Sequence, residues 1–156
     1  MKANWKGLLI AIAIPLGIGA LSSLLTGGSM ADFENLQKPP LSPPGWLFPV
    51  AWTILYTLMG IASYLVYTSD APEGEKRTAL IFYGAQLLAN FIWPILFFGL
   101  EWYFVAFLWI IVLWALILLT MLRFYRISPR AGDLLLPYLL WVTFAAYLNY
   151  GFWLLN

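Results

Sequence analysis

The sequence predicts an all-α membrane protein, a bundle of five transmembrane helices with a long first loop outside the cytoplasm. Three observations lead to this fold class. The chain of 156 residues is 63% hydrophobic and only 10% charged, which is too little polar surface for a water-soluble protein of this length. Its apolar residues form five long runs, each close to the ~20 residues that a helix needs to cross ~30 Å of hydrocarbon. Finally, lysine and arginine gather in the loops of one side.

The five apolar runs predict transmembrane helices at about residues 5–25, 44–68, 77–98, 102–124 and 133–155. The runs are continuous and do not alternate, and a closed membrane barrel would need more strands than this chain could supply. The first run also has the basic start, apolar centre and small residues of a signal peptide, but its removal would leave four helices. We therefore expect one five-helix domain over residues 1–156.

The placement of basic residues predicts the orientation. Of the eight lysines and arginines, all except Lys38 fall on one side of the predicted spans. Because short loops rich in these residues stay in the cytoplasm, we expect a cytoplasmic amino terminus and an outer carboxyl terminus, in the plasma membrane. The seven residues on the cytoplasmic side are Lys2, Lys6, Lys76, Arg77, Arg123, Arg126 and Arg130.

The composition also excludes several kinds of function. The chain has no cysteine and no histidine, which excludes disulfides, thiolate or imidazole metal sites, and catalysis by either residue. We expect no metal, no obligatory cofactor and no conventional catalytic group of residues. The net charge is +1, and the basic residues form no face other than their grouping on one side of the spans, so we do not expect nucleic acid as a partner. The expected partner is the lipid bilayer.

The first loop combines a short predicted helix with a stiff proline-rich run. A capping-box pattern predicts a helix near residues 30–37. The run KPPLSPP at 38–44 follows and cannot lie in a helix interior, although Pro44 suits the first turn of the next helix. Two interpretations remain open, a plain connector or a lid over a pocket, in which Lys38 and Leu41 would belong to the lid.

Small residues mark places where helices can approach closely. Gly19, Ser23 and Gly27 recur every four residues near the end of the first span, so another helix can pack there. Ala85 and Ala89 have the same spacing on the third span. We expect this pair to contribute to a homodimer, with a contact inside one chain as the alternative.

One polar face stands out inside the spans. Gln86, Asn90 and Trp93 are spaced by four and three residues, which places them on one face of the third helix. Amides in hydrocarbon are costly unless they are hydrogen-bonded, so this face should point into the bundle. The amides then either join helices to one another or contact a mostly apolar ligand.

The tryptophans suggest where such a ligand would lie. At ~1.5 Å per residue, four helices bring an indole or amide to similar depth, in the half of the membrane beneath the proline-rich run. Tyr56 lies one turn from Trp52, and Ala145 and Leu148 continue the face of Trp141. The shared depth predicts a flat, aromatic-lined cavity. The residues at this depth are Trp52, Asn90, Trp93, Trp109 and Trp141.

Four segments resemble one known family. FPVAWTILYTLMGIASYLV at 48–66, AQLLANFIWPILFFG at 85–99 and SPRAGDLLLPYLLWVTFAAYLNYGFW at 128–153 are similar to helices of the translocator protein family, also called TspO or peripheral benzodiazepine receptor. KPPLSPP at 38–44 is similar to the KPxWxPP pattern of its first loop. The likeness follows the family's order and length over nearly the whole chain, and we expect a prokaryotic member.

The resemblance implies a five-helix bundle, usually a homodimer, that binds porphyrins and related tetrapyrroles. Family members also bind benzodiazepine-type and isoquinoline ligands, and some bind sterols. In the family the pocket lies between helices under the first loop. The motifs place the implied ligand contacts at Pro44, Trp52, Tyr56, Asn90, Trp93, Trp141, Ala145 and Leu148.

The chain departs from the family pattern at two informative places. Leu41 stands where the family's first loop has a tryptophan, which removes an indole from the lid. After Tyr150 no lysine or arginine follows, although the family's sterol motif needs one, so sterol binding is not predicted.

The sequence thus predicts a membrane sensor or binding protein for porphyrins, in which protoporphyrin or haem is held mainly by shape. Axial ligation of haem would fall to methionine or tyrosine, because histidine and cysteine are absent. Two alternatives stay open. One is an enzyme that degrades porphyrin with light and oxygen, and the other is a transporter of small molecules, although the inverted repeats typical of transporters are not evident.

Overall fold

The computed structural model describes residues 4–26 and 35–156, and it confirms the prediction of an all-α bundle. Within these residues, five helices are long and apolar enough to cross a membrane, the third of them together with a π-helical turn, η2. The elements are α1 (Trp5–Thr26), α3 (Leu47–Tyr67), α4 (Glu73–Pro94), η2 (Ile95–Gly99), α5 (Tyr103–Ile127) and α6 (Pro129–Leu155).

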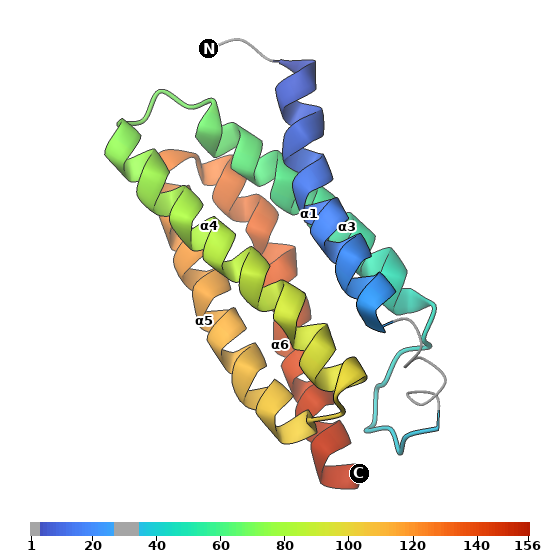
Figure 1. The fold of residues 1–156 in the computed structure, drawn as a ribbon. Coiled ribbons are helices and arrows are strands. Elements are labelled where there is room, and N and C mark those ends of the chain that lie inside the picture. The colour runs from blue at the N-terminus through green and yellow to red at the C-terminus, as the bar shows by residue number, and fades with distance from the viewer. Residues whose placement is uncertain (1–3, 27–34) are drawn as a thin grey trace.

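Two groups of helices make up the bundle (Figure 1). α5 packs along both α4 and α6, and α1 lies mainly against α3. Contacts between α3 and α6, with smaller ones from α1 to α4, join the two groups. The start of α1 and the end of α6 lie at opposite ends of the bundle, as an odd number of crossings requires.

Several helices differ from the predicted spans at their ends. α4 begins at Glu73 and not near residue 77, because its first turn is polar and lies outside the apolar run that defined the span. α6 begins at Pro129, where the Ser128 hydroxyl accepts a hydrogen bond from the Ala131 N–H at 3.4 Å. The prediction that Pro44 occupies the first turn of the second span is wrong, since α3 begins three residues later and the Pro44 carbonyl closes a turn onto the Leu47 N–H at 3.0 Å.

Most of the short helix expected near residues 30–37 lies outside the described residues. Residues 27–34 lie outside the described part of the chain, and with them Gly27 of the predicted small-residue stripe. Asn35 and Leu36 form a turn and a bend, so the end of the predicted helix is not helical. The proline-rich run that follows cannot support one.

Two glycines allow α1 and α3 to approach closely. A methyl group on Gly60 would lie 2.5 Å from the Ile12 Cα and 2.6 Å from the Ala11 carbonyl oxygen. On Gly19 it would lie inside the ring of Tyr56. Gly19 therefore does admit a neighbouring helix, as the small-residue spacing predicted.

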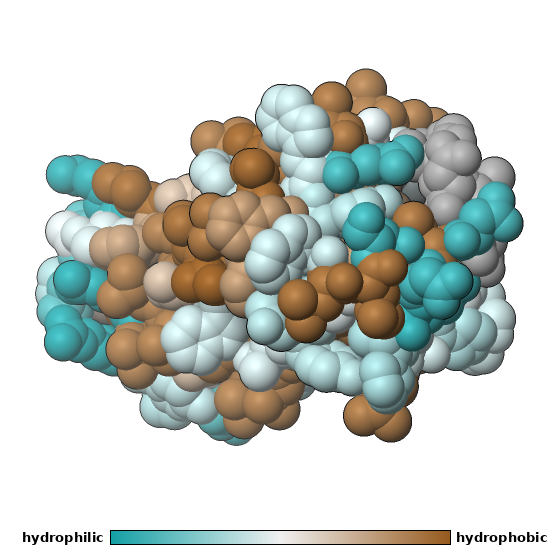
Figure 2. All heavy atoms as spheres, turned by 90° about the horizontal axis from the view of Figure 1, so that it is seen from below, coloured by the Kyte–Doolittle hydropathy of each residue, from teal (hydrophilic) through white to brown (hydrophobic). Residues whose placement is uncertain are grey.

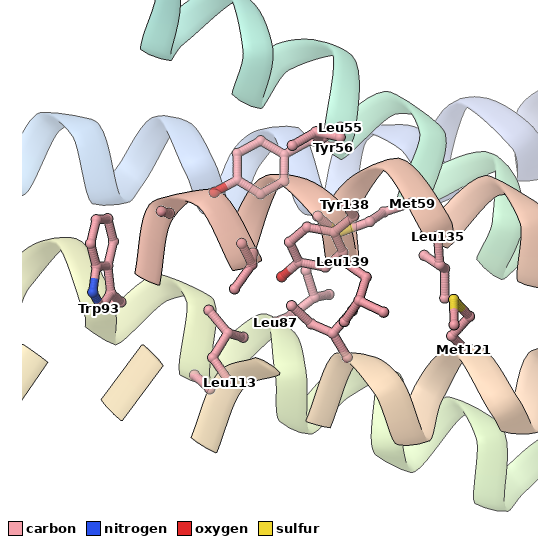
Figure 3. Packing of buried hydrophobic residues seen from close by; sticks show 14 of the residues in the cluster. Leu55, Tyr56, Met59, Leu87, Trp93, Leu113, Met121, Leu135, Tyr138 and Leu139 are labelled. Atoms are coloured by element: carbon pink, nitrogen blue, oxygen red, sulfur yellow. The ribbon is translucent and has the colours of Figure 1, made fainter. Parts of the chain in front are cut away.

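The core lies between α3, α4, α5 and α6, where the rings of Tyr56 and Tyr138 point into the interior among leucines and methionines (Figure 3). α1 contributes little, since its buried residues are Pro15 and Ser22. Figure 2 views the molecule from below the view of Figure 1, and on this end of the bundle apolar and polar side chains are mixed. Exposed leucines and isoleucines on every long helix suit a surface that meets acyl chains.

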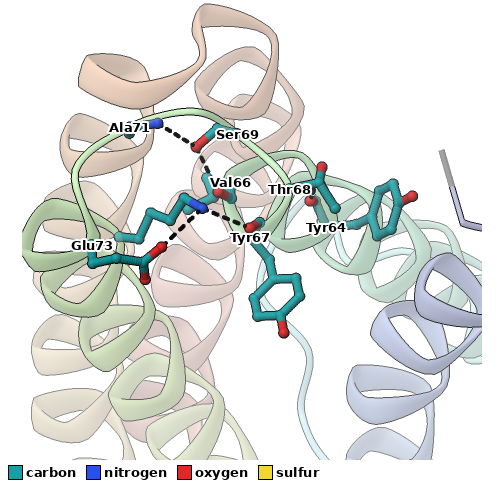
Figure 4. Close-up of polar contacts among 8 residues, drawn as sticks. Tyr64, Val66, Tyr67, Thr68, Ser69, Ala71 and Glu73 are labelled. Carbon is teal, nitrogen blue, oxygen red and sulfur yellow. Dashed lines mark hydrogen bonds and ion pairs between the residues drawn. The ribbon is translucent and has the colours of Figure 1, made fainter. Parts of the chain in front are cut away.

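The turn from α3 to α4 is fixed by local polar contacts (Figure 4). The Ser69 hydroxyl donates to the Val66 carbonyl at 2.8 Å and accepts from the Ala71 N–H at 3.4 Å. The Lys76 ammonium donates to the Tyr67 carbonyl at 3.1 Å and lies 3.6 Å from the Glu73 carboxylate. These contacts close the turn at the basic end of the bundle.

Candidate functional site

A cavity of about 410 Å³ lies between α1, α3, α4 and α6. It occupies the half of the bundle nearer the first loop, between the second half of α1 and the first turns of α3. Its lining is mostly apolar and aromatic. The lining residues are Leu16, Gly19, Ala20, Ser22, Ser23 and Thr26 of α1, Phe48, Pro49, Trp52, Thr53 and Tyr56 of α3, Trp93 and Pro94 of α4, Phe98 of η2, and Trp141 and Ala145 of α6.

Stacked and edge-on rings form one wall of the cavity. Trp52 stacks on Tyr56 with ring centroids 5.4 Å apart, one helical turn along α3. The Trp141 ring meets Trp52 edge-on at 6.4 Å and Phe48 at 6.1 Å. Two helices thus supply aromatic rings that lie against each other and face the same space.

The end of α4 supplies another part of the lining. Trp93 is buried, and its indole N–H donates to the Asn149 Oδ1 at 3.0 Å, which fixes the ring orientation. Pro94 then closes α4, and the backbone continues as a π-helical turn in which the Leu100 N–H reaches the Ile95 carbonyl at 2.8 Å. This wider turn carries Phe98 to the cavity.

Asn90 does not line the cavity, because its amide is used inside the bundle. Its Oδ1 accepts from the Tyr56 hydroxyl at 2.9 Å, and its Nδ2 donates to the Tyr138 hydroxyl at 2.7 Å. Tyr138 in turn donates to the Gln86 Oε1 at 2.6 Å. This buried network joins α3, α4 and α6, and it matches the interpretation of the amides as links between helices.

Two polar features of the lining matter for ligands. The Trp141 Nε1 is buried and has no hydrogen-bond partner among residues 4–26 and 35–156. None of the lining residues is charged, so the polar atoms that the described part of the chain offers are hydroxyl and indole groups. The site can therefore bind a flat apolar molecule by stacking, with few polar contacts.

The comparisons with known proteins now decide the family. Residues 11–154 match the profile of the TspO/MBR family, which is most of the chain. This chain belongs to the TspO/MBR family. The tryptophan-rich protein TspO of Chlorobaculum tepidum is 38% identical over 150 residues, covering 96% of this chain and 95% of the relative. The tryptophan-rich sensory protein of Cereibacter sphaeroides is 41% identical over 124 residues, 80% of this chain and 76% of its own length. The translocator protein of Sus scrofa is 36% identical over 155 residues, 98% of this chain and 92% of its own length.

The structure of this TspO/MBR family member brings together five of the eight predicted contact residues. The cavity lining includes Trp52, Tyr56, Trp93, Trp141 and Ala145. Three others do not line it. Asn90 lies behind Tyr56, Leu148 is buried in the core, and Pro44 precedes α3.

The predicted lid residues do not line the cavity either. Leu41 is exposed and has a positive φ of 70°. The loop before it is attached to the end of α6, where the Asn156 side chain donates to the Gln37 carbonyl at 2.9 Å and accepts from the Gln37 N–H at 3.1 Å. Further along, the Tyr147 hydroxyl donates to the Pro40 carbonyl at 2.7 Å. Residues 37–40, which include Lys38, therefore lie along the end of α6.

The alanine pair on α4 lies differently from its predicted role. Ala89 is buried within the chain, and its carbonyl accepts from the Trp109 indole N–H at 2.8 Å. Ala85 is only half-buried. This arrangement matches the alternative of a contact inside one chain, while the homodimer stays a prediction.

The same hydrogen bond shows that Trp109, although at the predicted depth, faces α4 and not the cavity.

Sequence reasoning missed the contribution of α1. Six of its residues line the cavity, yet the sequence identified this face only as a stripe of small residues for helix packing. The available signal was the spacing of Leu16, Gly19, Ser23 and Thr26, which recur on one face, and of these residues all except Leu16 are too small or too polar to fill a core. Phe98 was also missed, because a regular helix would not predict where the π-helical turn carries it.

Proposed function

We propose that this TspO/MBR family protein binds porphyrins and similar flat apolar ligands in the cavity between α1, α3, α4 and α6. The observation that carries the proposal is the cavity of about 410 Å³ whose lining includes indole and phenol rings from α3, α4 and α6. Its volume falls within the ~300–1,000 Å³ typical of small-molecule sites.

The aromatic walls suit a broad planar ligand. Each ring that stacks on another contributes ~0.5–1.5 kcal/mol beyond the burial of its surface. Trp52 and Trp141 are half-buried, so part of each ring remains available to a ligand, whereas Trp93 is held from behind by Asn149. A porphyrin or haem would be held by shape, because the lining residues include no histidine or cysteine to ligate iron.

The membrane location supports a binding or sensing role for such ligands. The cavity lies between helices that are long and apolar enough to cross a membrane, and porphyrins and other apolar rings partition into hydrocarbon. Some relatives are named sensory proteins and others translocator proteins. A sensor needs a site whose occupancy changes the protein, and the cavity with its ring cluster on α3 and α6 is our candidate for that site.

The test is a titration of the purified protein with protoporphyrin, followed by tryptophan fluorescence and by the porphyrin absorption band. We expect saturable quenching in the wild type and roughly tenfold weaker binding in Trp52→Leu and Trp141→Leu, since a lost stacked and buried ring is worth about 1.4 kcal/mol or more. The matched control is Trp5→Phe, because Trp5 is 77% exposed at the start of α1 and remote from the cavity lining.

The variants are compared by their dissociation constants and not by the amplitude of quenching, because every variant that lacks a tryptophan starts from a lower fluorescence. Quenching that never saturates in the wild type would contradict binding altogether. Equal constants in Trp52→Leu, Trp141→Leu and Trp5→Phe would show that the porphyrin binds somewhere other than this cavity.

A further inference from the structure

The hydroxyl groups of the cavity have a feature that the proposed function does not use. Three of them already donate their protons to backbone carbonyls. The Thr26 hydroxyl donates to the Ser22 carbonyl at 2.9 Å, the Ser22 hydroxyl donates to the Phe91 carbonyl at 3.3 Å, and the Thr53 hydroxyl donates to the Pro49 carbonyl at 2.7 Å. A hydroxyl has one proton and two lone pairs. These three groups therefore offer a ligand only acceptors.

Two of the lining residues that carry a hydroxyl, Ser23 and Thr53, lie at the mouth of the cavity. The exposed lining residues of α1 are Ala20 and Ser23, and those of α3 are Pro49 and Thr53. The opening therefore lies between the second half of α1 and the first turns of α3. Because α1 and α3 are both membrane spans, a ligand that passes this mouth comes from the hydrocarbon side.

An ionised group would be poorly accommodated at this mouth. No charged side chain of the described residues lines the cavity, so a carboxylate would lose its hydration without gaining a cationic partner. It would also face the lone pairs of the Thr53 hydroxyl. An uncharged group with an O–H or N–H would instead complete a hydrogen bond to the same oxygen.

We propose, on the basis of the porphyrin-type ligand inferred above, that this mouth selects uncharged ligands whose edge carries a hydrogen-bond donor, with Thr53 as the residue that determines this specificity. The carboxylates of a porphyrin such as protoporphyrin then stay outside the cavity, and its apolar edge enters.

Three forms of one ring test the proposal. Protoporphyrin carries two carboxylates, its dimethyl ester is uncharged and has no peripheral donor, and the diol made by reducing both carboxyl groups to alcohols is uncharged and has donors. With the protein in phosphatidylcholine nanodiscs, we expect the diol to bind most tightly, then the ester, then the diacid. The diol should exceed the ester by about threefold or more, as one hydrogen bond provides.

The variant Thr53→Val keeps a similar side-chain shape and removes the acceptor. It should abolish the advantage of the diol over the ester. The matched control is Thr57→Val, one turn along α3, because the Thr57 hydroxyl donates to the Thr53 carbonyl at 2.8 Å and does not line the cavity. The three rings partition differently into lipid, but this difference is the same for every variant, so the diol-to-ester ratio of affinities is the diagnostic quantity.

The outcomes separate this inference from the proposed function. If the diacid binds more tightly than the ester, or if Thr53→Val keeps the wild-type ratio, the proposed selectivity is wrong while porphyrin binding stands. If none of the three rings binds saturably, the proposed function fails and the selectivity fails with it.

Discussion

Replacing Gly60 by alanine should separate α1 from α3, and the structure indicates by how much. The added methyl carbon would lie 2.5 Å from the Ile12 Cα and 2.6 Å from the Ala11 carbonyl oxygen. Both atoms are backbone, so no side-chain rotation relieves the overlap. Ordinary contact between carbon atoms begins near ~3.5 Å, so the two helix axes must move apart by about 1 Å.

This movement has an estimable cost. Overpacking of a well-packed contact costs ~1–3 kcal/mol. At ~2–4 °C per kcal/mol for a chain of this size, a loss of about 2 kcal/mol lowers the melting temperature by about 4–8 °C. Gly84 is the matched control, since a methyl group there meets nothing within 4 Å. Gly84→Ala should be neutral or stabilise the protein by up to about 1 kcal/mol, because alanine is the better helix former.

Both variants can be compared by thermal unfolding of the purified protein in the same detergent, with circular dichroism as the readout. Protoporphyrin affinity should fall in Gly60→Ala and stay unchanged in Gly84→Ala, because α1 and α3 both line the cavity. If Gly60→Ala melts at or above the temperature of Gly84→Ala, the close approach of α1 and α3 at this glycine is not present in the folded protein.

Three other variants test separate parts of the structure. Tyr138→Phe removes a hydroxyl that takes part in two buried hydrogen bonds, so it should destabilise the protein by ~1–3 kcal/mol in denaturant titration; an unchanged midpoint would contradict the network. Gly19→Ala places a methyl group in the ring of Tyr56, so it should lower both the melting temperature and the affinity for protoporphyrin; retention of both would mean that Tyr56 can move freely. Asn156→Leu loses both hydrogen bonds to the Gln37 backbone and should speed proteolysis of the first loop with little change in melting temperature, whereas an unchanged cleavage rate would show that this contact does not hold the loop.

The fold could be predicted from the sequence because hydrocarbon imposes a simple rule. A helix that crosses it needs a continuous apolar run, and such runs are visible without knowledge of tertiary contacts. The helix ends were harder, since Glu73 and Pro129 lie in polar segments where backbone hydrogen bonds, and not hydropathy, decide the first turn. The prediction that Pro44 lies in the first turn of a helix was wrong for the same reason.

The sequence predicted the height of the site residues along the helices, but not which way their side chains face. Counting residues along a helix gives the height of Trp109 and Trp141 in the membrane equally well. Only packing between helices shows that Trp141 reaches the cavity while Trp109 donates to a backbone carbonyl of α4. Asn90 and Trp93 share one face of α4, yet one lies behind Tyr56 and the other on the cavity wall.

The division of roles among the polar groups explains what kind of site this is. The amides of Asn90 and Gln86 are used in hydrogen bonds between helices, so they hold the Tyr56 ring in place from behind and do not meet a ligand. A wall fixed in this way presents aromatic faces without the entropic cost of ordering them during binding. The polar selectivity is then left to the Thr53 hydroxyl of α3 at the mouth. It follows that changes to the network should alter stability and affinity together, whereas changes at Thr53 should alter which ligand binds and leave stability unchanged.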